Sequence, residues 1–302
     1  MSERYDIVGD VHGRAATLRE LVHRLGYRKE SGHWFHAEDR KLVSVGDLLD
    51  DGNNPLDCLE LVEEMADDGC ALPVMGNHEL NALHYMADPP LRRRSPDNTK
   101  QFASTLAQIE ADRARWERAR SFIERIPTRL ELDHGKVRVI HACWDENHID
   151  DLPLFIDTPE ILYRTSTTPP ENRDWSDNRD AALEAELKAA ADPLFVAIEQ
   201  CIKGAEVPCE PHPDHRGKIR FKKRVDWWNH YTGEARILFG HYKFPWAGDL
   251  HRATPAAPGW VPPRNRAACL DFGAHAGRML VVLRWPEEQF LTIDCLPQDL
   301  NR

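Results

Sequence analysis

Short apolar runs recur along the chain, and each of them ends abruptly at polar residues. Five such runs lead into Gly9-Asp10, Gly46-Asp47, Gly76-Asn77-His78, His141 and Gly240-His241. Apolar runs of this length are typical of buried strands. Because ligands of α/β proteins collect at the carboxyl ends of parallel strands, we expect these polar residues to meet at one edge of a sheet.

Helical periodicity separates the first three runs. Residues 18–25 and 56–66 place apolar side chains at helical spacing, and Gly26 and Gly69 follow as stop signals. This alternation of strands and helices predicts an α/β sheet. Near the end of the chain, residues 279–283 and 290–293 flank a turn and predict a hairpin at the edge of the sheet.

Two segments depart from this pattern. Residues 89–129 are charged, and a helix is predicted over 102–126. Residues 150–233 are rich in Pro, Asp and Trp, with a helix predicted near 181–202. We interpret 150–233 as a cap inserted into a single domain that spans 1–302. Six aromatic residues in or beside this segment are expected to form the core of the cap, with stacking on a nucleobase as the alternative: Trp144, Trp175, Trp227, Trp228, Tyr231 and Trp246.

The composition disfavours two classes of partner, nucleic acids and membranes. The chain carries 39 Lys and Arg against 50 Asp and Glu, a net charge of −11, which disfavours nucleic acid as a partner. No apolar run approaches the roughly 20 residues of a membrane span, so no membrane partner is expected. The seven cysteines are scattered and form no CxxC pair. Free thiols in the cytoplasm are the simplest interpretation.

The polar residues at the strand ends form a set of metal ligands. Carboxylates, imidazoles and a carboxamide together suit Mn²⁺, Fe or Zn²⁺. Asp10 and His12 can face one ion, and the two oxygens of Asp47 can bridge to a second. Three further residues would complete that second site: Asn77, His141 and His241. Two ions about 3.5–4 Å apart clamp a phosphoryl group, and a hydroxide between them attacks phosphorus in line.

Each ligand taken alone has an ordinary structural interpretation. A Gly-Asp pair can be a turn, a lone His can be a core residue, and Asn77-His78-Glu79 can begin a helix. Five strand ends that each supply a suitable donor favour a dinuclear centre instead.

The same motifs resemble those of a known enzyme family. They are GDVHG at 9–13, GDLLD at 46–50, GNHE at 76–79, His141, and Gly240-His241. The resemblance is to calcineurin-like metallophosphoesterases, in the branch of phosphoprotein phosphatases and symmetrical diadenosine tetraphosphatases. It spans residues 9–285 but not 150–233. It implies a four-layer α/β/β/α sandwich with a cap-like insertion and a metal-dependent phosphatase activity.

The resemblance also implies individual roles. Asp10, His12 and Asp47 hold the first ion, and Asp47 shares the second with Asn77, His141 and His241. His78 is the acid that protonates the leaving oxygen, and Asp50 pairs with His78. Two divalent ions are the expected cofactors, with Mn²⁺ preferred and Fe or Zn²⁺ as alternatives.

One position departs from the family pattern. An Arg that grips phosphate normally follows the residue at Asp50, but this chain has Asp51-Gly52. Another cation is expected to bind substrate. Arg164 is preferred, because the apolar residues Leu162 and Tyr163 precede it, and this segment, which follows the His141 strand, could bring it over the metal ions. The other candidates are Arg14, Lys243 and the basic run Lys218, Arg220, Lys222, Lys223 and Arg224.

Function is predicted at the level of the reaction. The chain is expected to be a dinuclear-metal-dependent phosphohydrolase that cleaves phosphoesters or phosphoanhydrides of nucleotides or dinucleoside polyphosphates. A Ser/Thr phosphoprotein phosphatase is the second possibility, and action on nucleic-acid ends the third. The rival from another class is a non-catalytic binding protein on the same scaffold.

Overall fold

A five-stranded mixed sheet forms one half of the core. The computed structural model describes residues 3–166, 191–213, 219–245, 256–262 and 264–300. The strand order is β13-β12-β1-β4-β5, with β1, β4 and β5 parallel and β12 antiparallel to both neighbours. The strands are β1 (Tyr5–Val8), β4 (Lys41–Ser44), β5 (Ala71–Pro73), β12 (Met279–Trp285) and β13 (Gln289–Asp294). The predicted edge hairpin is confirmed as β12–β13.

A four-stranded sheet in the order β11-β10-β7-β6 forms the other half. Its strands are β6 (Arg129–Leu132), β7 (Val137–Ile140), β10 (Arg236–Phe239) and β11 (Ala267–Cys269). Because β10 runs parallel to both β7 and β11, the carboxyl ends of β7 and β10 lie side by side.

Glycines let the strand ends of the two sheets approach closely. A Cβ on Gly240, after β10, would lie 1.8 Å from Asp10 Oδ1, and one on Gly9 would lie 2.0 Å from the Leu270 carbonyl oxygen. Any side chain at either position would force the two sheets apart.

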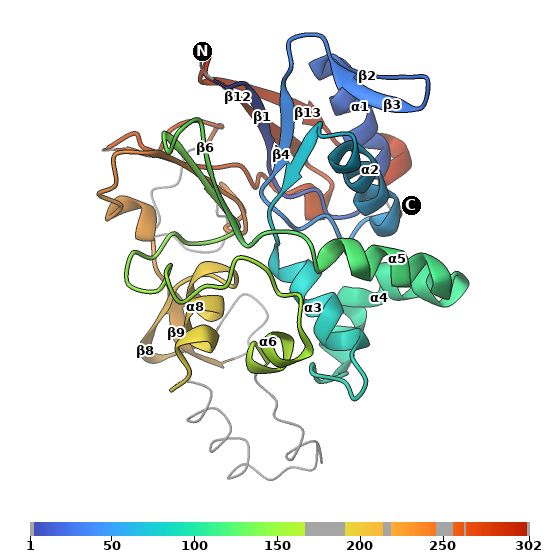
Figure 1. Ribbon diagram of the computed structural model, residues 1–302. Coiled ribbons are helices and arrows are strands. Elements are labelled where there is room, and N and C mark those ends of the chain that lie inside the picture. Colours follow the sequence, from blue (N-terminus) through green and yellow to red (C-terminus); the bar gives the residue numbers. More distant parts are fainter. Residues whose placement is uncertain (1–2, 167–190, 214–218, 246–255, 263, 301–302) are drawn as a thin grey trace.

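Two helices lie beside the five-stranded sheet (Figure 1). They are α1 (Ala15–Leu25) and α2 (Pro55–Asp67), and both predicted helices are confirmed. Gly26 ends α1 with a φ of 107°, which favours glycine. A small hairpin, β2 (Tyr27–Glu30) and β3 (His33–His36), follows α1. The apolar faces of α1 and α2 belong to the same buried core as the sheets.

Three helices follow β5: α3 (Asn77–Met86), α4 (Pro96–Ala111) and α5 (Arg113–Ile123). The single helix predicted over 102–126 was wrong, because Asp112 is extended, with a φ of −146°, and separates α4 from α5. The Asp112 carboxylate accepts a hydrogen bond from the Arg115 backbone N–H and so caps α5.

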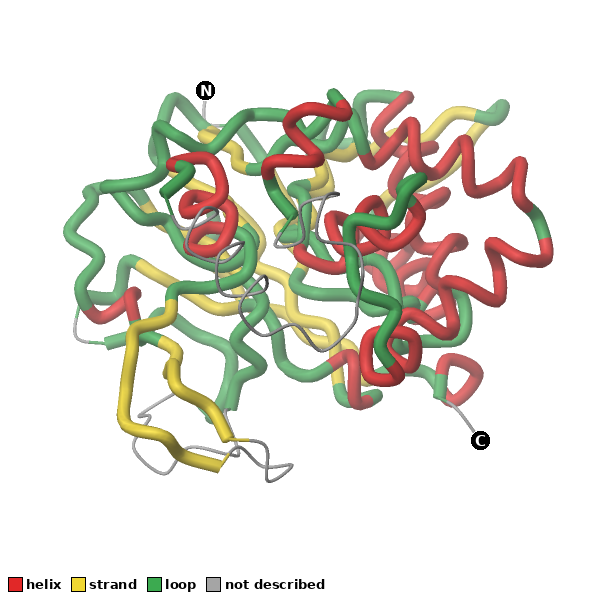
Figure 2. Tube along the Cα trace, turned by 90° about the horizontal axis from the view of Figure 1, so that it is seen from below, coloured by secondary structure: helices red, strands yellow, loops and turns green. Residues whose placement is uncertain are grey.

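The segment 150–233 contributes α6 (Pro159–Arg164), α8 (Pro193–Cys201), and the antiparallel pair β8 (Glu206–Pro213) and β9 (Ile219–Arg224). The β8–β9 hairpin projects from the body of the molecule (Figure 2). The helix predicted near 181–202 lies partly outside the described residues, and its described part is α8. Short 3₁₀ turns complete the described structure: η2 (Trp227–Asn229), η3 (Ala274–Ala276) and η4 (Pro297–Asp299).

Four of the six aromatic residues singled out in the sequence lie in the described part of the chain, and they pack as core. Trp227, Trp228 and Tyr231 are buried, and Trp228 stacks on Phe239 of β10 at 5.4 Å between ring centroids. Trp144 is buried as well, whereas Trp175 and Trp246 lie outside the described residues. These four residues therefore follow the core interpretation rather than the stacking alternative. Among the described residues, no helix is long and apolar enough to cross a membrane.

Candidate active site

The predicted ligands lie where strands of both sheets end. Asp10 follows β1, Asp47 follows β4, His141 follows β7 and His241 follows β10, and all four are buried. The backbone at Asp47 and His241 is left-handed, with φ values of 54° and 66°, as is that of His12. Non-glycine residues rarely adopt this conformation, and such strain clusters at functional sites.

The first group of ligands joins Asp10, His12 and Asp47, whose donor atoms lie within 4.8 Å of one another. His12 Nε2 is 3.8 Å from Asp10 Oδ2 and 3.9 Å from Asp47 Oδ2. Both ring nitrogens of His12 are buried and have no hydrogen-bond partner among the described residues. The other ring nitrogen, His12 Nδ1, lies 3.4 Å from Asp51 Oδ2. Asp51 therefore contacts the nitrogen of His12 that does not face Asp10 and Asp47.

The second group joins Asp47, His141 and His241, again within 4.8 Å. Asn77 Oδ1 lies 2.7 Å from His241 Nδ1 and 3.1 Å from His141 Nε2. His141 Nδ1 donates to the Val45 carbonyl oxygen at 2.8 Å. Burial opposes protonation of this ring, but the Asp47 carboxylate raises the pKa of His141, so Nε2 becomes an acceptor that faces Asn77 Oδ1 once its proton is lost. Two acceptors that face each other suit a cation between them.

The electrostatics of the cluster fit a pair of divalent cations. Burial, together with the Asp271 and Asp47 carboxylates, raises the pKa of Asp10 well above its usual range. Burial also holds the pKa of His12 and that of His241 well below theirs, which keeps both rings neutral and able to donate a lone pair. Buried acids that repel each other, beside ring nitrogens of His12 and His241 that have no hydrogen-bond partner in the described part of the chain, are the donors expected of a metal centre.

His78 and Asp50 form a buried pair at the edge of the cluster. His78 Nδ1 lies 2.6 Å from Asp50 Oδ2, and Nε2 lies 3.7 Å from Asp47 Oδ2. Burial alone would lower the pKa of His78, but the Asp47 charge and the hydrogen bond with Asp50 raise it to about 9. The Thr105 hydroxyl donates to Asp50 and fixes that carboxylate. The raised pKa favours a protonated His78 beside the predicted ligands.

Comparison with known proteins decides the family. Residues 4–196 match the calcineurin-like phosphoesterase family. The chain belongs to the calcineurin-like phosphoesterases. A relative from Halalkalibacterium halodurans, named asymmetrical bis(5′-nucleosyl)-tetraphosphatase PrpE, is 31% identical over 297 residues, which cover 96% of this chain and 93% of the relative. The Bacillus subtilis relative of the same name is 24% identical over 303 residues, or 99% and 98% of the two chains.

Solved structures show the same fold. A protein provisionally assigned as a diadenosine tetraphosphatase superposes with a TM-score of 0.51 at 15% identity and covers 98% of this chain and 96% of its own. A cold-active protein tyrosine phosphatase reaches 0.50 at 18% identity, over 97% and 79%. The predicted mixed α/β metallophosphoesterase fold is confirmed, and the chain is a hydrolase of the phosphoesterase class.

Glu79 is a residue of this phosphoesterase that the sequence reasoning passed over. Its buried carboxylate accepts hydrogen bonds from the backbone N–H groups of Asp47, Leu48, Leu49 and Gly76, at 2.8–3.1 Å. The loop that carries Asp47 is thereby tied to the start of α3. In the sequence, Glu79 is the last residue of the GNHE motif, and this position indicated only an acidic residue in the first turn of a helix.

Glu79→Ala is expected to lower the free energy of unfolding by about 3–5 kcal/mol, because several buried N–H groups lose their acceptor. Urea denaturation measures this loss. Glu131→Ala removes an exposed acid that pairs with Arg138 at 3.6 Å, and it should cost less than about 1 kcal/mol. Equal losses in the two variants would contradict the role assigned to Glu79.

The cations that could replace the family Arg have different surroundings. Arg14 donates to the carbonyl oxygens of Ala274 and His275 and so anchors the C-terminal region. Arg164 forms a two-point ion pair with Asp192 at 2.8 and 2.9 Å, and the part it was expected to play in substrate binding stays a prediction.

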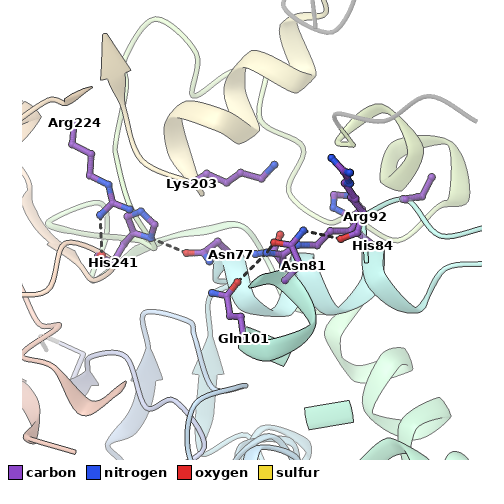
Figure 3. A pocket seen from close by; sticks show the side chains of 11 residues that line it. Asn77, Asn81, His84, Arg92, Gln101, Lys203, Arg224 and His241 are labelled. Carbon is purple, nitrogen blue, oxygen red and sulfur yellow. Dashed lines mark hydrogen bonds between the residues drawn. The ribbon is translucent and has the colours of Figure 1, made fainter. Parts of the chain in front are cut away.

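A cavity of about 480 Å³ opens beside the ligands Asn77 and His241 (Figure 3). Four cationic residues that the sequence reasoning did not bring together line it: Arg92, Arg93, Lys203 and, from the basic run, Arg224. Of the rest of that run, Lys222 and Lys223 are exposed, and Lys218 lies outside the described residues.

Proposed function

We propose that this phosphoesterase hydrolyses dinucleoside polyphosphates with two divalent metal ions, of which Mn²⁺ is preferred. The observation that carries the proposal is the position of Asp47, which belongs to both buried ligand groups and lies 3.7 Å from His78. Asp10, His12 and Asp47 would hold one ion, and Asp47, Asn77, His141 and His241 would hold the other. Two such ions supply polarisation of the phosphoryl oxygens and an acidified water as nucleophile.

His78 and Asp50 complete the chemistry on the protein side. Asp50 holds Nδ1 of His78 and leaves the proton on Nε2 directed toward the ligand cluster. That proton passes to the departing oxygen when the bond to phosphorus breaks. The nucleotide therefore leaves with a proton on its terminal phosphate and with one negative charge fewer.

The substrate class is supported by the relatives and by the cavity. Relatives that align over nearly the whole chain are named asymmetrical tetraphosphatases. The cationic cavity next to the ligands suits a chain of phosphates, although the protein as a whole carries a net charge of −11. Residues 150–233 are proposed to cap the site within a single domain, because Lys203 and Arg224 both come from that segment and line the cavity. Seven free thiols support a cytoplasmic location.

A substrate panel tests this proposal. With Mn²⁺, diadenosine tetraphosphate is expected to be cleaved at least about 100-fold faster than a phosphopeptide, and a chelator is expected to abolish the activity until Mn²⁺ is restored. Chromatography of the products distinguishes ATP plus AMP from two ADP. Preference for the phosphopeptide would favour the phosphoprotein phosphatase alternative. Binding of nucleotides without any hydrolysis would favour the non-catalytic one.

A further inference from the structure

The cavity beside the metal ligands has an unusual charge for this molecule. Four of its eleven lining residues are Arg or Lys, and none of the described residues that line it carries a carboxylate. The chain as a whole has 50 acidic against 39 basic residues. Cations gathered in a concave site raise the local concentration of an anionic ligand. The remaining polar lining includes Asn81, Asn98 and Gln101, whose amides can donate to phosphate oxygens.

Arg92 forms one side of this cavity. Its guanidinium is half-buried and donates to Gln101 Oε1 at 2.9 Å and to Asn98 Oδ1 at 3.2 Å. Gln101 Nε2 in turn lies 3.3 Å from His78 Nε2. The Asp50 carboxylate acts electrostatically on Arg92. Arg92 is therefore linked through Gln101 to the His78–Asp50 pair, which belongs to the motif where the family pattern places an Arg and this chain has Asp51.

Lys203 and Arg224 form the opposite side. Lys203 follows α8 and extends across the cavity above Asn77 (Figure 3). Its ammonium pairs with Glu199 on the preceding turn. Arg224, at the end of β9, donates to the His241 carbonyl oxygen at 3.4 Å and lies over the Tyr242 ring at 5.5 Å. Both side chains are thus held by contacts of their own while they line the cavity that reaches the ligands.

We propose that this cavity is an oligophosphate-binding site, in which Arg92 replaces the missing family Arg and, with Lys203 and Arg224, binds the phosphates beyond the scissile phosphorus. The inference rests on the proposed function for the identity of the whole substrate. The site itself requires only a linear chain of phosphates. Cations on opposite sides of the cavity suit such a chain better than a single phosphate, because successive phosphates can each meet a cation.

Calorimetry with a hydrolysis-resistant probe tests this site without relying on turnover. The Mn²⁺-loaded protein is titrated with bismethylene triphosphate and, separately, with inorganic phosphate, at constant free Mn²⁺. Arg92→Met and Lys203→Met are each expected to weaken triphosphate binding by about 10- to 100-fold, as for loss of a hydrogen bond to a charged group. Arg94→Met is the matched control. Arg94 is exposed, lies over the Tyr85 ring and does not line the cavity, so affinity should change by less than about 3-fold.

Two results would overturn the proposal. One is wild-type protein that binds triphosphate no more tightly than phosphate. The other is a Lys203→Met variant that behaves like Arg94→Met, because a loss in Arg92→Met alone could arise through Gln101 and His78. Protein that binds triphosphate as expected but hydrolyses no dinucleoside polyphosphate would support the binding site and contradict the proposed substrate.

Discussion

Asp47→Asn is expected to lower turnover by at least about 10³-fold and to reduce the metal content of the purified protein. Asp47 Oδ1 lies 3.3 Å from His141 Nε2, and Oδ2 lies 3.9 Å from His12 Nε2, so one carboxylate serves both ligand groups. Asparagine has nearly the same shape but no charge. It can keep the hydrogen bond from the His78 backbone N–H, at 2.9 Å, while it loses the anion shared by the two sites. Elemental analysis and kcat measure the two effects.

A second buried aspartate provides the control. Asp133 accepts hydrogen bonds from the Glu3 backbone N–H at 3.2 Å and from Trp285 Nε1 at 3.1 Å, away from the ligand cluster. Asp133→Asn should lower the melting temperature without a change in metal content. If Asp47→Asn kept its full metal content and turnover, the shared-ligand arrangement would be wrong.

The ligand cluster could be predicted from sequence because its signals are local. The apolar runs before Asp10, Asp47 and His141 become β1, β4 and β7, and each run stops where the polar residue begins. The parallel strands β1 and β4 end side by side in one sheet, β7 ends in the other sheet, and the two sheets pack with these ends together. The residue types that follow the strands therefore predicted which side chains come together, without any knowledge of side-chain packing.

The contacts around the cluster depend on segments that are distant in sequence. Arg92 lies in the loop between α3 and α4, and it meets Gln101 only when α4 folds back beside His78. Apolar periodicity carries no information about such a polar contact. The same limit explains the helix predicted over 102–126, since the hydrogen bond that caps α5 at Asp112 leaves the apolar spacing unchanged.

Arg164 makes a contact that its position in the sequence did not predict. Its place in the chain, after the His141 strand, suggested a position above the metal ligands. Asp192 caps α8, where its carboxylate accepts a hydrogen bond from the Leu194 backbone N–H at 3.0 Å. The sequence before a helix predicts such a cap, but it does not predict that the same carboxylate also pairs with Arg164. The two-point ion pair between Arg164 and Asp192 joins α6 to the start of α8 and so stabilises the local structure of 150–233.

His78→Ala is expected to lower kcat by about 10²- to 10⁴-fold with unchanged metal content, because His78 donates a proton but is not a ligand. The loss should depend on the leaving group. An alkyl phosphate ester, whose alkoxide is a strong base, needs the proton and should show the full effect. A nitrophenyl phosphate leaves as a stable anion, so its hydrolysis should fall much less.

The Asp50→Asn variant separates the proton donor from its support. Asp50 acts only through His78, 2.6 Å away, so its loss should be smaller than that of His78→Ala, about 10- to 100-fold, with the same dependence on the leaving group. An equal loss for both esters in His78→Ala would mean that His78 acts on binding or on the nucleophile instead. Loss of metal from that variant would make His78 part of the ligand structure. Only a loss that grows with the basicity of the leaving oxygen, at constant metal content, identifies His78 as the acid.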